Sequence, residues 1–351
     1  MSYFRPEIDE MEGYVPGEQP KGMTFIKLNT NENPYPPSPE VEKLLKSCDF
    51  ARLRLYPDPL CTELREAAAE LYGVRGENII IGNGSDDILT IAIRSFTSDK
   101  KPLGCMTPTY SLYKVLARIQ GAECKEVKLN GDFSLPENLL EQASGTGLFI
   151  FARPNAPTGN SFPIELIEKF CAGFDGAVMI DEAYADFARE NCLGLVGKYP
   201  NVIICRTLSK SYSLAGARLG LAVASPEIIA GMMKVKDSYN VNMLTQKIAA
   251  AAIRDQAYFT EITGKIKKTR KRLNEELRKL SFAATESETN FLFVSPPDGD
   301  GEKYYEYLRK SLILVRYFPG DMTGHCVRIT VGTDDETDKL LELTSKYVRS
   351  A

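Results

Sequence analysis

The amino-acid sequence predicts an α/β fold, in which a mostly parallel sheet lies between helices and a smaller α+β domain follows. Short apolar runs alternate with helical patterns from residue 78 to residue 224, which is typical of a parallel sheet covered on both faces. Beyond residue 240, long helical patterns mix with short strands. We therefore expect an N-terminal arm over residues 1–37, a large domain over 38–240 and a small domain over 241–351.

Composition excludes several classes of function. The chain has 351 residues and a formal net charge of −4, which argues against a nucleic-acid partner. No apolar run is long enough to span a membrane, and the N-terminus lacks an apolar signal segment, so we expect a cytoplasmic protein without membrane contact. The eight scattered cysteines form no C-x-x-C pair and suit a reduced compartment. The single histidine, His325, excludes multi-histidine metal sites, and we expect no metal.

The first 40 residues lack helical or strand periodicity and are rich in Pro and Gly. Such an arm is either disordered or laid over another surface, for instance that of a second subunit. A helix is predicted to start after Ser38 as its cap, with Pro39 in the first turn. A second helix is predicted over residues 62–72, ending at Gly73.

The first strand–loop–helix unit runs from a strand at residues 78–81 through a glycine-rich loop to a helix at 88–96. A loop of this kind presents backbone N–H groups and a helix dipole to a phosphate, which would lie against Gly84 and Ser85. Asp86 caps the helix but would also repel an anion. A tight turn without any ligand is the commoner explanation of such a loop.

Three further units repeat this pattern, with strands at residues 103–106, 148–151 and 177–180. Ligands bind beyond the carboxyl ends of parallel strands. The residues that follow these strands are therefore expected to gather with Ser85 at one rim of the sheet: Tyr110, Asn155, Asp181 and Tyr184.

Lys210 follows another buried strand, at residues 202–205, and is surrounded in sequence by small hydroxyl residues. A lysine fixed at the end of a strand can be desolvated, which lowers its pKa and makes it a nucleophile towards an aldehyde. The alternative is a surface lysine in a loop. Arg218 follows shortly afterwards, beyond Gly216.

The C-terminal third is predicted to form the small domain, with helices and strands at residues 241–253, 258–280, 291–294, 302–312, 313–318, 326–331 and 335–348. In the strand at 326–331, alternation places Val327, Ile329 and Val331 on one face. Arg328 then points away from the core, towards a cleft where a guanidinium suits a carboxylate or phosphate. The alternative is a surface ion pair.

Together these residues match the needs of a pyridoxal-type aldehyde. Lys210 would form the Schiff base, and Asp181 would keep the ring nitrogen protonated. Asn155 and Tyr184 would donate to the ring hydroxyl, and Tyr110 would stack on the ring. The phosphate would be held by Gly84, Ser85, Ser209 and Arg218. Nicotinamide and nucleotide-phosphate motifs, G-x-G-x-x-G and Walker A, are absent.

Several motifs, in this order, resemble those of fold-type I pyridoxal-phosphate-dependent aminotransferases. They are Asn-Glu-Asn-Pro at 31–34, Tyr-Pro-Asp at 56–58, Pro-Asn-Ala-Pro-Thr-Gly at 154–159, Asp-Glu-Ala-Tyr at 181–184 and Ser-Lys-x-x-x-Leu-Ala-Gly-x-Arg-Leu-Gly at 209–220. Three segments are similar to the histidinol-phosphate aminotransferase subfamily: Tyr-Val-Pro-Gly at 14–17, Leu-Asn-x-Asn-Glu-Asn-Pro at 28–34 and Val-Arg-Ile-Thr-Val-Gly-Thr at 327–333.

This resemblance implies amino-group transfer between L-histidinol phosphate and 2-oxoglutarate, in histidine biosynthesis, with pyridoxal 5'-phosphate as cofactor. It implies Lys210, Asp181 and Tyr110 as catalytic residues. It further implies a homodimer with shared active sites, in which Tyr56 reaches the cofactor phosphate of the neighbour. The cofactor set is Gly84, Ser85, Asp86, Tyr110, Asn155, Asp181, Tyr184, Ser209, Lys210, Arg218 and Tyr56. The substrate set is Tyr14, Asn31, Asn155, Arg316 and Arg328.

Other functions remain open from the sequence. A threonine-phosphate decarboxylase-like enzyme or an aromatic amino acid aminotransferase would use the same cofactor site. A cofactor-sensing regulator would need a DNA-binding domain, for which there is no room before Leu28, and a structural scaffold would not require this set of residues. Two departures from the family pattern are Arg153, which we expect to influence substrate selection, and Ala156, where a second Asn is common.

Overall fold

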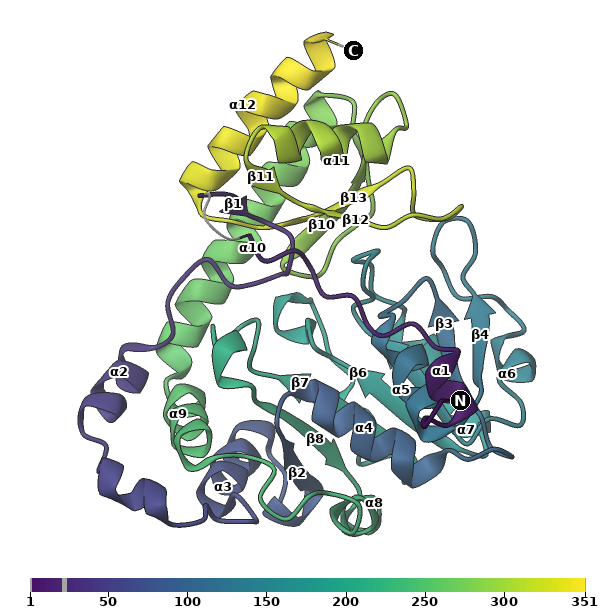
Figure 1. Cartoon of the computed structure of the whole chain (residues 1–351), viewed down its shortest axis with the longest axis vertical. Coiled ribbons are helices and arrows are strands. Elements are labelled where there is room, and N and C mark those ends of the chain that lie inside the picture. Colours follow the sequence, from purple (N-terminus) through teal and green to yellow (C-terminus); the bar gives the residue numbers. More distant parts are fainter. Residues whose placement is uncertain (1, 21–23, 351) are drawn as a thin grey trace.

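The computed structural model of the chain describes residues 2–20 and 24–350. Figure 1 shows a larger unit built on a seven-stranded sheet and a smaller unit above it, with the N-terminal segment crossing both. In the described part of the chain, no helix is long and apolar enough to cross a membrane. All eight cysteines are free.

The large sheet has the strand order β2-β8-β7-β6-β5-β3-β4. Its strands are β2 (Ile79–Gly82), β3 (Leu103–Thr107), β4 (Cys124–Lys128), β5 (Leu148–Ala152), β6 (Ala177–Asp181), β7 (Val202–Thr207) and β8 (Gly220–Ala224). Only β8 runs antiparallel to its neighbours within this sheet, so the mostly parallel sheet is confirmed. The sequence pattern missed β4, because an edge strand is half exposed and β4 carries charged residues.

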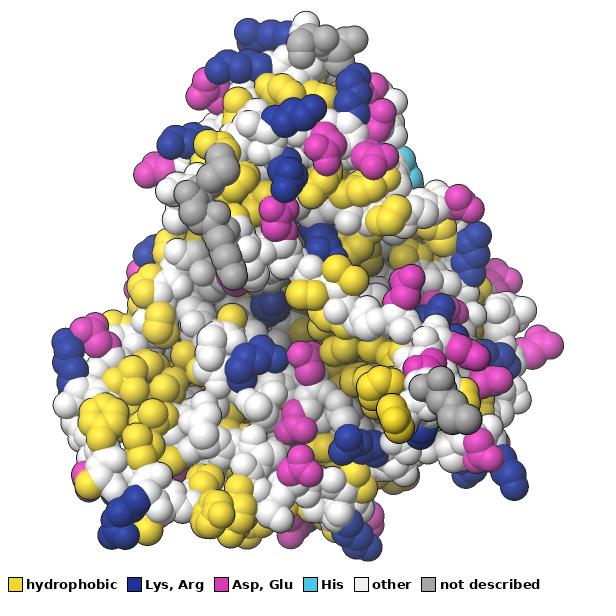
Figure 2. All heavy atoms as spheres, in the orientation of Figure 1, with side chains coloured by type: hydrophobic (Ala, Val, Ile, Leu, Met, Phe, Trp, Pro, Cys, Tyr) yellow, Lys and Arg dark blue, Asp and Glu magenta, His cyan; other side chains and the backbone are white. Residues whose placement is uncertain are grey.

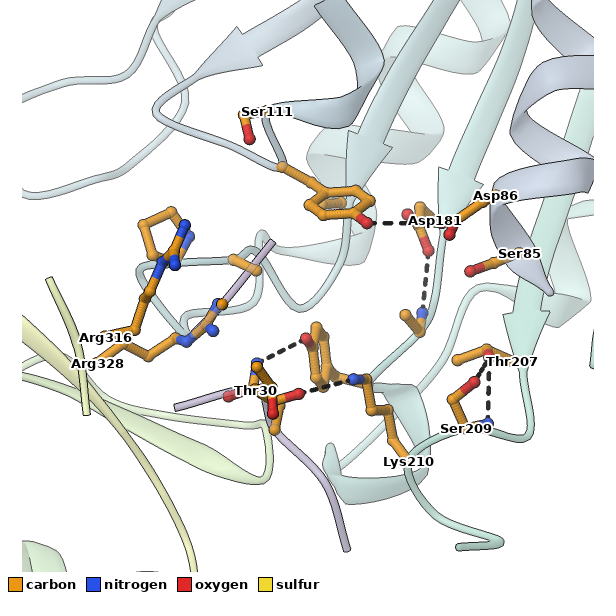
Figure 3. Close-up of a pocket in the computed structure, with 18 of the residues that line it drawn as sticks. Thr30, Ser85, Asp86, Ser111, Asp181, Thr207, Ser209, Lys210, Arg316 and Arg328 are labelled. Carbon is orange, nitrogen blue, oxygen red and sulfur yellow. Dashed lines mark hydrogen bonds between the residues drawn. The ribbon is translucent and has the colours of Figure 1, made fainter. Parts of the chain in front are cut away.

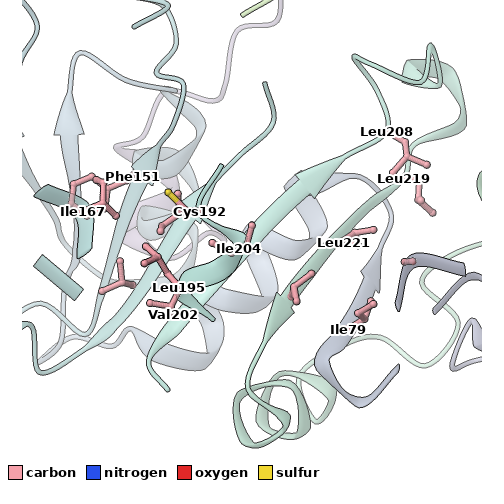
Figure 4. Close-up of a cluster of buried hydrophobic side chains, with 14 of the residues drawn as sticks. Ile79, Phe151, Ile167, Cys192, Leu195, Val202, Ile204, Leu208, Leu219 and Leu221 are labelled. Carbon is pink, nitrogen blue, oxygen red and sulfur yellow. The ribbon is translucent and has the colours of Figure 1, made fainter. Parts of the chain in front are cut away.

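Helices cover both faces of this sheet. On one face lie α4 (Ser85–Phe96), α5 (Leu112–Gln120) and α8 (Pro226–Met233). The other face is covered by α3 (Thr62–Tyr72), α6 (Leu139–Gln142), α7 (Ile164–Gly173) and α9 (Met243–Arg254). Figure 4 shows part of the core on this second face, where Ile204 and Leu221 project from neighbouring strands. The apolar runs of the sequence are therefore buried on both sides, as predicted.

Local signals in the sequence set most element boundaries. Helix α2 (Pro39–Lys46) begins after Ser38, whose hydroxyl accepts a hydrogen bond from the backbone N–H of Glu40. Helix α3 ends at Gly73, in the left-handed conformation, as expected. Helix α4 begins three residues earlier than predicted, because Gly84 already serves as its N-cap.

The small unit contains α10 (Gln256–Lys279), α11 (Gly301–Lys310) and α12 (Asp334–Ser350). Its antiparallel sheet has the order β12-β13-β10-β9, with β9 (Ala283–Ala284), β10 (Phe291–Ser295), β12 (Arg316–Tyr317) and β13 (Val327–Thr330). The strand expected at 313–318 is divided, because β11 (Ile313–Leu314) pairs with β1 (Ile26–Lys27) whereas β12 pairs with β13. Val327, Ile329 and Val331 are buried, as the alternation predicted.

The N-terminal arm lies over its own chain. Its helix α1 (Pro6–Asp9) is next to α5, and Arg5 donates a hydrogen bond to the carbonyl of Ile119 at 2.7 Å. The arm then reaches the small unit, where β1 runs parallel to β11 (Figure 1). The domain boundaries at 37/38 and 240/241 remain predictions.

Candidate active site

One cavity of about 280 Å³ lies between the carboxyl ends of the large sheet and the small sheet. Figure 3 shows Arg316 and Arg328 on one side of it, Asp181 on the other and Lys210 below them. The cavity brings together most of the residues that the sequence singled out: Tyr14, Asn31, Ser85, Asp86, Tyr110, Asp181, Tyr184, Ser209, Lys210, Arg218, Arg316 and Arg328.

Lys210 lies in the wall of the cavity, three residues after the end of β7. Its ammonium donates a hydrogen bond to the carbonyl of Thr30 at 3.2 Å, and its own carbonyl accepts one from the side chain of Asn33 at 2.9 Å. Burial lowers the pKa of Lys210 to about 8, and the positive charges of Arg328 and Arg218 add to this effect. A substantial fraction of the amine is therefore neutral near pH 8.

Asp181 ends strand β6 and is buried. One carboxylate oxygen accepts a hydrogen bond from the hydroxyl of Tyr113 at 2.6 Å, and the other accepts from the backbone N–H of Ala183 at 3.2 Å. Burial raises the pKa of Asp181 to about 6, although both hydrogen bonds act in the opposite direction. The pair required by the sequence argument, a desolvated amine and a buried carboxyl, thus shares one cavity.

The start of α4 has the backbone features that the predicted phosphate site requires. Gly84 is the N-cap, with φ of +87° and no side-chain cap, so the first backbone N–H groups of the helix have no side-chain acceptor there. A Cβ at Gly84 would lie 2.5 Å from Nη2 of Arg218, so the glycine lets the guanidinium approach. Arg218 also contacts Asp86 at 3.2 Å, and Ser209 lies in the same wall.

Aromatic side chains line the cavity between these charged groups. The ring of Tyr110 meets those of Tyr14 and Tyr113 edge-on, with centroid distances of 5.8 Å and 5.5 Å. The hydroxyl of Tyr184 accepts a hydrogen bond from the side chain of Asn31 at 2.8 Å. These contacts hold in place Tyr110, the predicted stacking ring, and Tyr184, the predicted hydroxyl donor.

Two arginines enter the cavity from the small sheet. Arg328 donates to the carbonyl of Asn29 at 2.9 Å, and its guanidinium lies 5.2 Å from the ring centres of Phe291 and Phe318. Arg316 donates to backbone carbonyls of the arm at 3.1 and 3.2 Å. Among the described residues, neither arginine has a carboxylate within salt-bridge distance, and the Nε of Arg328 is buried without an acceptor. Unpaired guanidinium groups in a cavity suit an anionic ligand.

Three residues of the predicted set do not line the cavity. The side-chain N–H groups of Asn155 are engaged by the carbonyl of Pro108 at 3.0 Å and the hydroxyl of Thr158 at 2.7 Å. Gly84 acts through its backbone at the start of α4. Tyr56 is 79% exposed and stacks on Tyr239, outside the cavity. The roles of Asn155 and Tyr56 in cofactor binding remain predictions.

Sequence reasoning missed Tyr113, Glu32 and Thr207, which also line the cavity. Tyr113 could have been found, because it lies three residues after Tyr110 at the start of a predicted helix. Arg153, expected to influence substrate selection, is 1% exposed and is not among the cavity residues. It donates to the carbonyl of Phe162 at 2.7 Å and pairs with Glu190 at 2.8 Å.

Comparisons with known proteins identify the family of the chain. Residues 23–343 match the family model for aminotransferases of class I and II. The chain is 45% identical over 349 residues to histidinol-phosphate aminotransferase 1 of Trichormus variabilis, with 99% of each chain covered. It is 46% identical to the histidinol-phosphate aminotransferase of Geotalea uraniireducens, with 97% of each covered.

Among solved structures, the chain resembles the histidinol-phosphate aminotransferase from Sinorhizobium meliloti in complex with pyridoxal-5'-phosphate. The TM-score is 0.89 at 26% identity, and the match covers 100% of this chain and 98% of that one. The α/β fold predicted for this chain is thereby confirmed. The chain belongs to the class I and II aminotransferase family, and its full-length relatives place it in the histidinol-phosphate aminotransferase branch of that family.

Proposed function

We propose that this protein transfers an amino group between L-histidinol phosphate and 2-oxoglutarate, with pyridoxal 5'-phosphate as its cofactor. The relatives that support this are named histidinol-phosphate aminotransferases and match nearly the whole chain. The observation that carries the proposal is the cavity itself. It combines a lysine of lowered pKa, a buried carboxyl and two unpaired arginines.

The residues present fit the cofactor. Its phosphate suits the space beside Gly84, which a Cβ would fill. Three side chains near this space can donate to the phosphate: Ser85, Ser209 and Arg218. Asp181 is a buried carboxyl without a cationic partner in the described chain, as a protonated ring nitrogen requires. Tyr110 offers an aromatic face for the ring.

When bound, pyridoxal 5'-phosphate supplies an electrophilic aldehyde carbon and a ring that accepts the electron pair released at the substrate Cα. Lys210 would be the residue that holds the aldehyde carbon through its amine, because burial leaves this amine partly neutral near pH 8. Freed when the substrate amine takes its place on that carbon, the Lys210 amine would take the proton from the substrate Cα and return it at the aldehyde carbon of the cofactor. Asp181 holds the proton on the ring nitrogen. Tyr184, oriented by Asn31, donates to the ring hydroxyl.

Arg316 and Arg328 bind the anionic end of each substrate in turn. The phosphate of L-histidinol phosphate and a carboxylate of glutamate each accept two parallel hydrogen bonds from a guanidinium. Because the two arginines have no acidic partners in the described chain, no protein ion pair has to break when substrate enters. Arg316 also donates to carbonyls of the arm, so the arm lies where it can respond to substrate.

The direct test is an assay of purified protein loaded with pyridoxal 5'-phosphate. Glutamate should form from L-histidinol phosphate and 2-oxoglutarate, and Lys210→Ala should reduce the rate by about 10⁴-fold by removing the acid–base group. Lys271→Ala, on an exposed face of α10, is the matched control and should keep the rate. Release of carbon dioxide without any need for 2-oxoglutarate would contradict the proposal and favour a decarboxylase.

A homodimer is part of the proposal. Large apolar side chains are exposed around the 3₁₀ turn at residues 50–54, and Figure 2 shows this apolar patch at the lower left of the molecule. Phe50, Leu53, Leu55 and Tyr56 are 60%, 53%, 47% and 79% exposed. Contiguous apolar surface of this kind marks an interface. Tyr56, within the patch, would then reach the site of the second copy.

Light scattering during size-exclusion chromatography tests the dimer. The wild type should have twice the mass of the chain, and Leu53→Asp should shift it towards the monomer. Leu166→Asp on α7, at a residue 47% exposed, is the control that should stay dimeric. A monomeric wild type with full activity would overturn this part.

A further inference from the structure

Tyr113 has no role in the family motifs that led to this site, yet it makes the shortest contact of Asp181. Its side chain is fully buried, and its hydroxyl lies 2.6 Å from a carboxylate oxygen of Asp181. The second oxygen is held by the backbone N–H of Ala183. We propose that Tyr113 is a positioning residue, which holds Asp181 as an oriented carboxylate for the pyridine nitrogen of pyridoxal 5'-phosphate. This inference rests on the proposed function.

The environment of Asp181 makes this hydrogen bond necessary. Burial opposes the ionised form of Asp181, and two negative charges add to this effect, Asp86 from α4 and Glu182, the next residue in the chain. The nearby Cys205 on β7 and Tyr184 are neutral at pH 7, because burial raises the pKa of both. A hydrogen bond to a charged acceptor is stronger than one between neutral groups. Hydrogen-bond donors are therefore what keeps the Asp181 carboxyl ionised while no cofactor is bound.

Tyr113 also has a fixed geometry. It belongs to α5, and its ring meets that of Tyr110 at 5.5 Å and 88°. The short segment 110–113, which leads into α5, thus positions both the ring proposed to stack on the cofactor and the hydroxyl that contacts Asp181. Each oxygen of Asp181 still has a lone pair for a further donor. Because Asp181 is already oriented, cofactor binding does not lose free energy to the ordering of this side chain.

The test removes a single oxygen atom. Tyr113→Phe keeps the ring packing and deletes the hydroxyl. The matched control is Tyr304→Phe, which removes an equally buried hydroxyl that contacts Thr344 at 2.7 Å in the small unit. Equilibrium titration of cofactor-free protein with pyridoxal 5'-phosphate should give a dissociation constant about 10-fold higher for Tyr113→Phe, from the loss of a charge-assisted hydrogen bond. Tyr304→Phe should bind as the wild type does.

A second readout needs no cofactor and no activity. The infrared carbonyl band of the protonated Asp181, assigned by its loss in Asp181→Asn, should titrate at higher pH in Tyr113→Phe than in the wild type. In the Asp181→Asn background, Tyr113→Phe should have no further effect on cofactor affinity. This distinguishes action through Asp181 from a general loss of packing.

The outcomes separate this inference from the proposed function. If the wild type neither binds pyridoxal 5'-phosphate nor forms glutamate, the proposed function fails. If the wild type does both, while Tyr113→Phe keeps its cofactor affinity and its infrared titration, the role of Tyr113 alone is overturned. Equal loss of affinity in Tyr113→Phe and Tyr304→Phe would also overturn it, because the effect would then be one of stability.

Discussion

Arg206 and Arg328 are two arginines withdrawn from solvent, and their surroundings are opposite. Arg206, on β7, has a side chain 7% exposed and pairs with Glu182 at 2.7 Å and Asp186 at 3.0 Å. Burial acts to lower the pKa of Arg206, but these two carboxylates raise it above its ordinary value. Arg328, on β13 in the cavity wall, has no carboxylate partner in the described chain, and burial lowers its pKa.

The difference separates a structural charge from a binding charge. Glu182 directly follows Asp181, and Asp186 accepts a hydrogen bond from Ser211, which directly follows Lys210. The ion pairs of Arg206 therefore join the two segments that carry the reacting groups. Arg328 instead lies close to two aromatic rings, and its buried Nε–H has no acceptor among the described residues. In the proposed function, the anion of the substrate is its partner.

The largest expected effect is on stability, at Arg206. Arg206→Met should lower the free energy of unfolding by about 3–5 kcal/mol, because Glu182 would be left as an uncompensated buried charge. Urea unfolding followed by circular dichroism measures this. The control is Arg254→Met, which breaks a pair with Glu63 that is more than half exposed. In this control, the free energy of unfolding should change by less than about 1 kcal/mol. An equally small change in Arg206→Met would show that Arg206 has no structural role.

Asp181 extends the comparison to a negative charge without a cationic partner. Its folded pKa of about 6 exceeds the ordinary value of 3.8, so the stability that it contributes is present below pH 3.8 and is lost as the pH rises through 6. The loss amounts to about 3 kcal/mol between these values. Cofactor-free wild type should therefore show a fall in stability over this pH range that is absent in Asp181→Asn. Parallel stability profiles for the two proteins would contradict this expectation.

Arg328 should show the reverse pattern of Arg206. Arg328→Met should lower kcat/KM for L-histidinol phosphate by about 10²-fold, as expected for loss of one partner of an enclosed charge pair. The free energy of unfolding should stay unchanged or rise, because the unpaired charge is removed. Steady-state kinetics and urea unfolding on the same preparation measure both. A loss of stability as large as that of Arg206→Met would show that Arg328 is structural.

The sequence predicted the large sheet because its strands are buried on both faces and are nearly all apolar. It missed β1, β4 and β9, which are short or half-exposed edge strands whose side chains carry little pattern. Lys210, Asp181 and Arg328 were predicted from their places at strand ends or on one strand face. The contact of Tyr113 with Asp181 and the inward hydrogen bonds of Asn155 depend on side-chain direction. Direction is fixed by packing between segments far apart in the chain, so no local pattern reveals it.

The arm has a consequence for biosynthesis of the protein. Asn31 contacts Thr330, 299 residues later, and β1 pairs with β11 near the other end of the chain. On the ribosome, β1 has no strand partner, and Asn31 lacks its contact with Thr330, until almost all of the polypeptide has emerged. Contacts between such distant segments form slowly. The wall of the cavity that includes Thr30 and Asn31 is thus among the last parts to assemble, and a chain released early would contain Lys210 and Asp181 but no closed pocket.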